Sequence, residues 1–139
     1  MLLLTLSVTI TLSLCPVIAL DTATDNMIRV HAGIQSKALQ DNSIISAESV
    51  PACIEEIYTE VQQYRIGKPV LSAVEIIKQI RLIALTKTIE KALKENKKRI
   101  SSSDLDDVTQ EIVSQIQTTM KLSDLYQQTI RAIEEKSRE

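Results

Sequence analysis

Residues 73–99 contain neither glycine nor proline, and this uninterrupted stretch constrains the fold more than any other feature of the sequence. At about 1.5 Å of rise per residue, a helix of this length spans about 40 Å. Its start is marked by Ser72 and Glu75, which fit a capping box that satisfies otherwise unpaired backbone donors. The sequence therefore predicts one long helix.

Aliphatic side chains surround this predicted helix on more than one side. One face comprises Ala73, Ile77, Ile80 and Ala84, and another comprises Leu82, Leu85, Ile89, Ala92 and Leu93. Because an apolar surface this wide needs neighbours on several sides, we expect this helix to be the central one. Lys78 and Arg81 within it disfavour a membrane span.

The rest of the chain also favours helices, because only two glycines and three prolines occur in 139 residues. Helices are predicted at residues 25–40, 51–66, 104–120 and 124–136. Pro51 suits a first helical turn, and Gly67 suits a helix end. Ser103 is the expected N-cap of the 104–120 helix. The last two are either one helix with an offset or two helices separated at Ser123.

Two of these predicted helices carry an apolar stripe. In the helix at 25–40 the stripe is Met27, Val30, Ile34 and Ala38, and in the helix at 51–66 it is Cys53 or Ile54, then Ile57, Val61 and Tyr64. We expect both stripes to face the core. The predicted fold class is all-α, a compact bundle of four or five helices around the long central helix, forming a single domain over residues 20–139.

The first twenty residues carry no charged side chain. Their length nearly suits a bilayer span. Pro16, and the small residues Val17 and Ala19, favour a cleaved signal peptide over residues 1–19. An uncleaved anchor is the alternative, because no Lys or Arg follows Met1. We expect a secreted or extracytoplasmic protein, with the eukaryotic secretory route favoured over the bacterial periplasm.

Composition and motifs argue against two functional classes. The chain has 18 acidic and 16 basic residues, no Phe or Trp, and three Tyr. Nucleic-acid binding is not expected, because it usually requires a basic excess and aromatic stacking. No phosphate-binding loop, nucleophile elbow or metalloprotease motif is present. We therefore expect no enzyme and no cofactor.

Cys53 is the only cysteine left once the signal peptide is removed. A single cysteine in a secreted protein indicates an interchain disulfide, a reactive thiol or a buried inert one. A position in the first turn of a helix favours the thiolate. A spacing of four residues from Ile57 instead favours burial. All three interpretations stay open.

Two charged clusters and one histidine complete the candidates. Lys94, Lys97, Lys98 and Arg99 could contact an anionic surface, although cations are also expected at a helix C-terminus. Asp104–Asp107 lacks the glycine and glutamate of a calcium loop and is typical of a helix start. His31 has no partner nearby in sequence, and no metal site is predicted.

These features predict an exported, non-enzymatic helical protein that binds another protein through a helix surface, such as an effector, an inhibitor or an immunity-type protein. A homodimer is one form that this interaction could take. The alternative is a carrier that holds an apolar small molecule or lipid between its helices. Membrane contact is expected only if the N-terminal segment is not cleaved.

Overall fold

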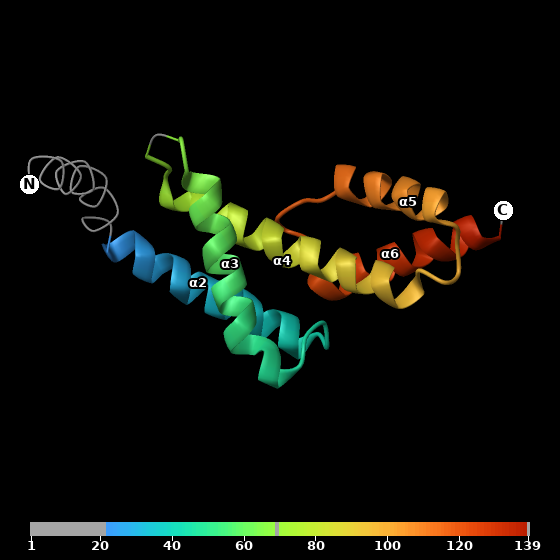
Figure 1. Cartoon of the computed structure of the whole chain (residues 1–139), viewed down its shortest axis with the longest axis horizontal. Coiled ribbons are helices and arrows are strands. Elements are labelled where there is room, and N and C mark those ends of the chain that lie inside the picture. Colours follow the sequence, from blue (N-terminus) through green and yellow to red (C-terminus); the bar gives the residue numbers. More distant parts are fainter. Residues whose placement is uncertain (1–21, 69, 139) are drawn as a thin grey trace, which may run out of the picture.

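The computed structural model describes residues 22–68 and 70–138, and within these residues the chain forms helices and no strand (Figure 1). The all-α class is confirmed. The elements are α2 (Thr22–Asp41), a short 3-10 helix η1 (Ala47–Ser49), α3 (Val50–Arg65), α4 (Ala73–Asn96), α5 (Ser102–Ser114) and α6 (Leu122–Ser137). The signal peptide predicted at residues 1–19 lies outside the described residues. No helix within the described ranges has both the length and the apolar character of a membrane span.

The five α-helices pack together, and α4 contacts each of the other four. In Figure 1, α2 and α3 lie toward the N-terminal end of α4, whereas α5 and α6 lie toward its C-terminal end. The most extensive contacts are those of α4 with α6, of α2 with α3, and of α2 with α4. The described helices therefore form one packed helical arrangement.

Local sequence explains where several helices begin and end. Pro51 lies in the first turn of α3, and Gly67 follows α3 with a φ of 75°, in the left-handed region that favours glycine. The Ser72 hydroxyl accepts a hydrogen bond from the Glu75 backbone N–H at 3.2 Å, as the capping motif predicts. The N-cap of α5 is Ser101 rather than Ser103, and it accepts from the Asp104 backbone N–H.

Two helix ends differ from the sequence prediction. Helix α4 ends at Asn96 instead of residue 99, and α5 ends at Ser114 instead of residue 120. Residues 115–121 form a connection, so the C-terminal region contains two helices. The carbonyl oxygens of Thr118 and Met120 accept hydrogen bonds from the Arg81 guanidinium, at 3.4 Å and 2.7 Å, rather than from following backbone N–H groups. This tertiary contact stabilises a non-helical connection.

The core is aliphatic, as the absence of Phe and Trp requires, and α4 contributes residues to it from several sides. Ile80, in the middle of α4, is fully buried. The buried residues of α4 are Ile76, Ile80, Ile83, Ala84, Leu85, Thr88, Ile89 and Ala92. Ala73 and Ile77 were expected in this set, but Ala73 is exposed and Ile77 is only partly buried.

The buried face of α2 also differs from the prediction. Its buried residues are Ile28, Ala32, Ser36 and Leu39, whereas the predicted stripe was Met27, Val30, Ile34 and Ala38. Of that stripe, Met27 and Ala38 pack against the edge of the core, and Val30 and Ile34 are exposed. The predicted stripe of α3 is confirmed at Cys53, Ile57 and Val61, which are all buried, whereas Tyr64 is only partly buried.

Candidate functional site

The outer face of α2 presents two aliphatic side chains to solvent. Val30 is 60% exposed and Ile34 is 52% exposed. Residues four apart lie on the same side of a helix, so these two side chains are adjacent. Lys37 and Asp41 continue the same side and form an ion pair at 3.2 Å. We call Val30 and Ile34 the α2 outer face.

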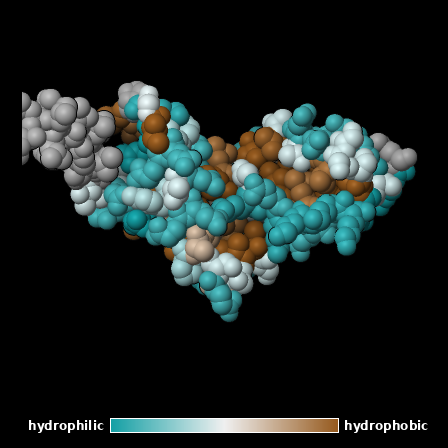
Figure 2. Space-filling model, viewed as in Figure 1, coloured by the Kyte–Doolittle hydropathy of each residue, from teal (hydrophilic) through white to brown (hydrophobic). Residues whose placement is uncertain are grey.

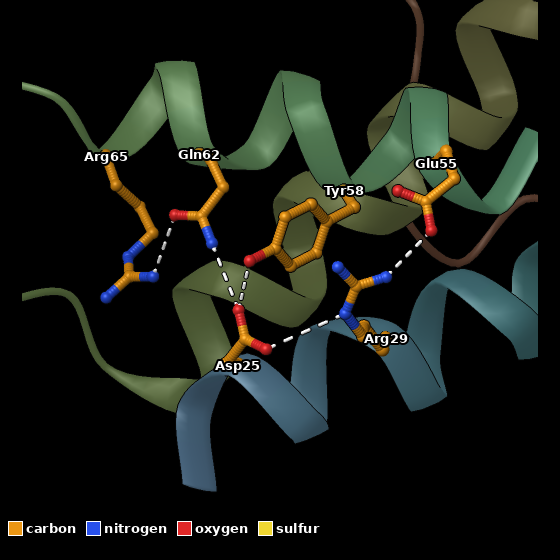
Figure 3. Close-up of polar contacts among 6 residues, drawn as sticks. All are labelled: Asp25, Arg29, Glu55, Tyr58, Gln62 and Arg65. Atoms are coloured by element: carbon orange, nitrogen blue, oxygen red, sulfur yellow. Dashed lines mark hydrogen bonds and ion pairs between the residues drawn. The ribbon is translucent and has the colours of Figure 1, made fainter. Parts of the chain in front are cut away.

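Polar contacts with α3 fix the orientation of α2 about its own axis (Figure 3). Asp25 on α2 accepts hydrogen bonds from the Tyr58 hydroxyl and, at 3.4 Å, from the Gln62 side-chain amide on α3. Arg29, one turn further along α2, donates to Glu55 Oε1 at 2.8 Å. Figure 3 shows these side chains extending between the two helices.

Arg29 makes two further contacts in this network. Its guanidinium carbon lies 3.9 Å from the centroid of the Tyr58 ring, and its Nε lies 3.6 Å from Asp25 Oδ2. The hydrogen bond that Arg29 donates to Glu55 raises the pKa of Arg29, so the guanidinium stays charged. The side of α2 that carries Asp25 and Arg29 is thereby held against α3.

A second anchor ties α2 to α4 and to the α5–α6 connection. Arg81 on α4 donates to Gln35 Oε1 at 2.6 Å and to the carbonyl oxygens of Thr118 and Met120. Burial lowers the pKa of Arg81. Because contacts to α3 and to α4 occupy two sides of α2, Val30 and Ile34 remain on its open side.

Cys53, the candidate thiol, lies in the core and not on the surface. It is 4% exposed and shares the buried side of α3 with Ile57 and Val61. Beside it on α3, Glu56 accepts a hydrogen bond from Lys87 on α4 at 2.6 Å. An interchain disulfide would require the Cys53 sulfur to reach the surface.

The predicted basic cluster lies at the C-terminal end of α4, where all four side chains are exposed. Lys94 lies in the last turn of α4, Lys97 is the C-cap, and Lys98 and Arg99 follow. Arg99 donates to Asn96 Oδ1 at 3.2 Å and lies 3.7 Å from Glu134 on α6. The three lysines and Arg99 are thus gathered at one end of the molecule, and Glu134 partly compensates their charge.

The structure also places the acidic run, His31 and two hollows of the surface. Asp104–Asp107 lies in the first turns of α5, and His31 is partly buried on α2. Within residues 22–68 and 70–138, no three His, Cys, Asp or Glu side chains are grouped to hold a metal ion. A hollow of about 210 Å³ between α3 and α4 is lined by Glu60, Gln79, Leu82, Ile83, Thr86, Lys87 and Glu90. Another, of about 290 Å³ between α5 and α6, is lined by Glu111, Ile112, Gln115, Gln128, Arg131, Ala132 and Glu135.

Sequence reasoning missed Arg81 as an anchor and the exposure of Val30 and Ile34. A signal for the second was present, since Ile28, Ala32 and Leu39 also recur at helical spacing and mark the side that is in fact buried. The sequence contains no comparable signal for the anchoring contacts of Arg81, because its partners come from segments distant in sequence.

Comparison with known proteins provides no further assignment. The chain matches no protein-family model, and neither the curated proteins nor the solved structures give a significant match.

Proposed function

We propose that the protein is an exported, non-enzymatic helical protein that binds a partner protein through the α2 outer face. One observation carries the proposal: Val30 and Ile34 are adjacent aliphatic side chains that are more than half exposed on a helix whose other sides are anchored. Helices that present apolar side chains at this spacing commonly bind a groove or another helix of a partner. The uncharged N-terminal stretch supports export.

The arrangement of the helices supports such a role. In the proposed architecture α4 is the central helix, with which each of the other four is in contact. It would act as the scaffold that holds α2 in a fixed position. A rigid helix loses little conformational freedom on binding, which favours affinity.

The two hollows of the surface give little support to the alternative proposal, a carrier of an apolar small molecule or lipid. Both are lined mainly by charged and polar side chains, including Glu60, Lys87 and Glu90 in one and Glu111 and Arg131 in the other. Sites for apolar ligands are lined predominantly by apolar side chains. Native mass spectrometry of the exported protein would support the carrier proposal if a lipid remained bound.

Site-specific photo-crosslinking in the producing cells tests the partner-binding proposal. A photoreactive amino acid replaces Ile34 on the α2 outer face, and the matched control replaces Gln110, which is exposed on α5. We expect one predominant protein adduct from position 34 and none from position 110. In the same experiment, the added substitution Val30→Lys should remove the adduct, because it places a charge within the apolar contact.

The proposal is wrong if position 34 gives no adduct, or if both positions give the same products. An adduct of twice the chain mass would identify the partner as a second copy. Circular dichroism of the Val30→Lys variant serves as the folding control. Because Val30 is 60% exposed, we expect its unfolding midpoint to stay close to that of the unmodified chain.

A further inference from the structure

The connection between α3 and α4, together with the first turn of α4, exposes three aliphatic side chains. Ile66 is 76% exposed, Val70 is 99% exposed and Val74 is 60% exposed. These are half of the large, strongly exposed apolar residues within the described ranges, and they fall within nine positions of the sequence. We call Ile66, Val70 and Val74 the α3–α4 tip. Figure 2 shows a small apolar patch at this end of the molecule, among hydrophilic side chains.

The α3–α4 tip lies beside the start of α2. Asp25, in the first turn of α2, accepts hydrogen bonds from Tyr58 and Gln62, which lie in the second half of α3. Helices α2 and α3 therefore run antiparallel, and the end of α3 is close to the beginning of α2, as Figure 1 shows. The chain that precedes Thr22 joins the described structure at this same end.

The sequence that precedes α2 is itself suited to lipid. Residues 1–20 carry no charged side chain and are predominantly apolar, at a length close to that of a bilayer span. One end of the molecule thus combines an exposed aliphatic tip with the attachment point of this stretch. We propose that, before residues 1–20 are removed, the α3–α4 tip contacts the phospholipid bilayer that receives this stretch.

The residues at the base of the α3–α4 tip suit the boundary between lipid and water. The Lys68 ammonium donates to the Tyr64 carbonyl oxygen at 2.7 Å and lies 3.9 Å from the centroid of the Tyr64 ring. Tyrosine is enriched at membrane interfaces, and lysine can keep its charge in water while its aliphatic stem covers apolar surface. The charged group at this position is therefore held back toward α3.

The free energy gained by burying the α3–α4 tip in lipid is too small for this contact to be the sole membrane anchor. The contact would act as a second attachment. Full removal of one such aliphatic side chain from water strengthens binding by about tenfold or more. Stable attachment of a protein to a membrane generally requires two such signals. Residues 1–20 would supply the first, and the α3–α4 tip would orient the helical region on the bilayer. This contact is independent of the partner proposed for the α2 outer face.

Tryptophan fluorescence of the full chain tests the inference, because the sequence contains no tryptophan. Val70→Trp places one reporter in the α3–α4 tip. Val113→Trp is the matched control, at a half-exposed valine on α5. Both variants are reconstituted into phosphatidylcholine vesicles with bromine on the acyl chains. We expect emission from position 70 to shift to shorter wavelength and to be quenched by the brominated lipid, with neither change at position 113.

Two results would overturn the inference. In the first, acrylamide in the aqueous phase quenches the reporter at position 70 equally with and without vesicles. In the second, the emission from position 70 shifts to shorter wavelength in the absence of lipid, and the shift grows with protein concentration. That result would show that the α3–α4 tip contacts another copy of the chain. Circular dichroism of both variants before reconstitution confirms that they are folded.

Discussion

At the scale of single residues, Ser36 places a polar side chain within the core. Its side chain is fully buried on α2, and within the described structure its hydroxyl oxygen has no hydrogen-bond partner. A buried polar group without a partner costs roughly 1–3 kcal/mol relative to one that is satisfied. We therefore expect Ser36→Ala to raise the free energy of unfolding by about 1 kcal/mol. Urea denaturation followed by circular dichroism measures this change.

Thr88 provides the matched control for this prediction. It is also fully buried, but its hydroxyl donates to the Ala84 carbonyl oxygen at 3.0 Å. Thr88→Ala removes a satisfied hydroxyl and a packed methyl group, so it should lower the free energy of unfolding. If Ser36→Ala destabilises the protein as Thr88→Ala does, then the Ser36 hydroxyl makes a stabilising contact and the prediction is wrong.

At the scale of elements, the sequence predicted the helices better than the faces they bury. Capping and the scarcity of glycine and proline are local signals, and they placed the start of α4 at Ala73. The buried face predicted for α2 was wrong because apolar residues occur on two sides of this helix. Only tertiary contacts determine which of the two sides packs against the core. The end of α5 was missed for the same reason, because Arg81 binds the carbonyl groups of the connection that follows.

The contact of α4 with α6 includes a hydrogen bond that should be lost at high pH. The Tyr126 hydroxyl on α6 donates to Glu95 Oε1 on α4 at 2.7 Å. This hydrogen bond, together with burial and the nearby Glu95 charge, raises the pKa of Tyr126 above its usual value of about 10. The unfolded chain therefore loses this proton at lower pH than the folded chain. The stability that the contact contributes is complete below about pH 10 and is lost as the pH rises through the folded pKa.

Tyr126→Phe tests this dependence, because it removes the hydroxyl and keeps the ring. We expect the variant to be less stable than the parent chain at pH 8, and the difference should shrink as the pH rises well above 10. Urea midpoints of both proteins at each pH provide the comparison, which cancels the titration of all other groups. A difference that stays constant with pH would show that Tyr126 contributes by packing alone.

At the scale of the whole molecule, the distribution of charge follows the arrangement of the helices. Residues 68–100, which include α4, carry nine basic and three acidic side chains, whereas the segments before and after are net acidic. Two pairs bring these segments together, Lys87 with Glu56 on α3 and Arg99 with Glu134 on α6. Exposed pairs of this kind contribute little to stability. The charge pattern of the sequence therefore indicates that α4 packs against acidic segments. It does not indicate which segment packs near the start of α4 and which near its end.

The intact mass of the exported protein, measured with and without reductant, tests the processing of the chain and the state of Cys53 together. We expect a monomer that begins near Leu20, with a mass unchanged by reductant, because Cys53 is 4% exposed and its sulfur is covered by the core. The thiol should react with an alkylating reagent only after denaturation, since reaction requires access of the reagent to the thiolate. Cys53→Ala should give the same oligomeric state. A doubled mass that halves on reduction would instead require α3 to expose Cys53 in a covalent dimer. A chain that begins at Met1 would show that residues 1–20 are retained.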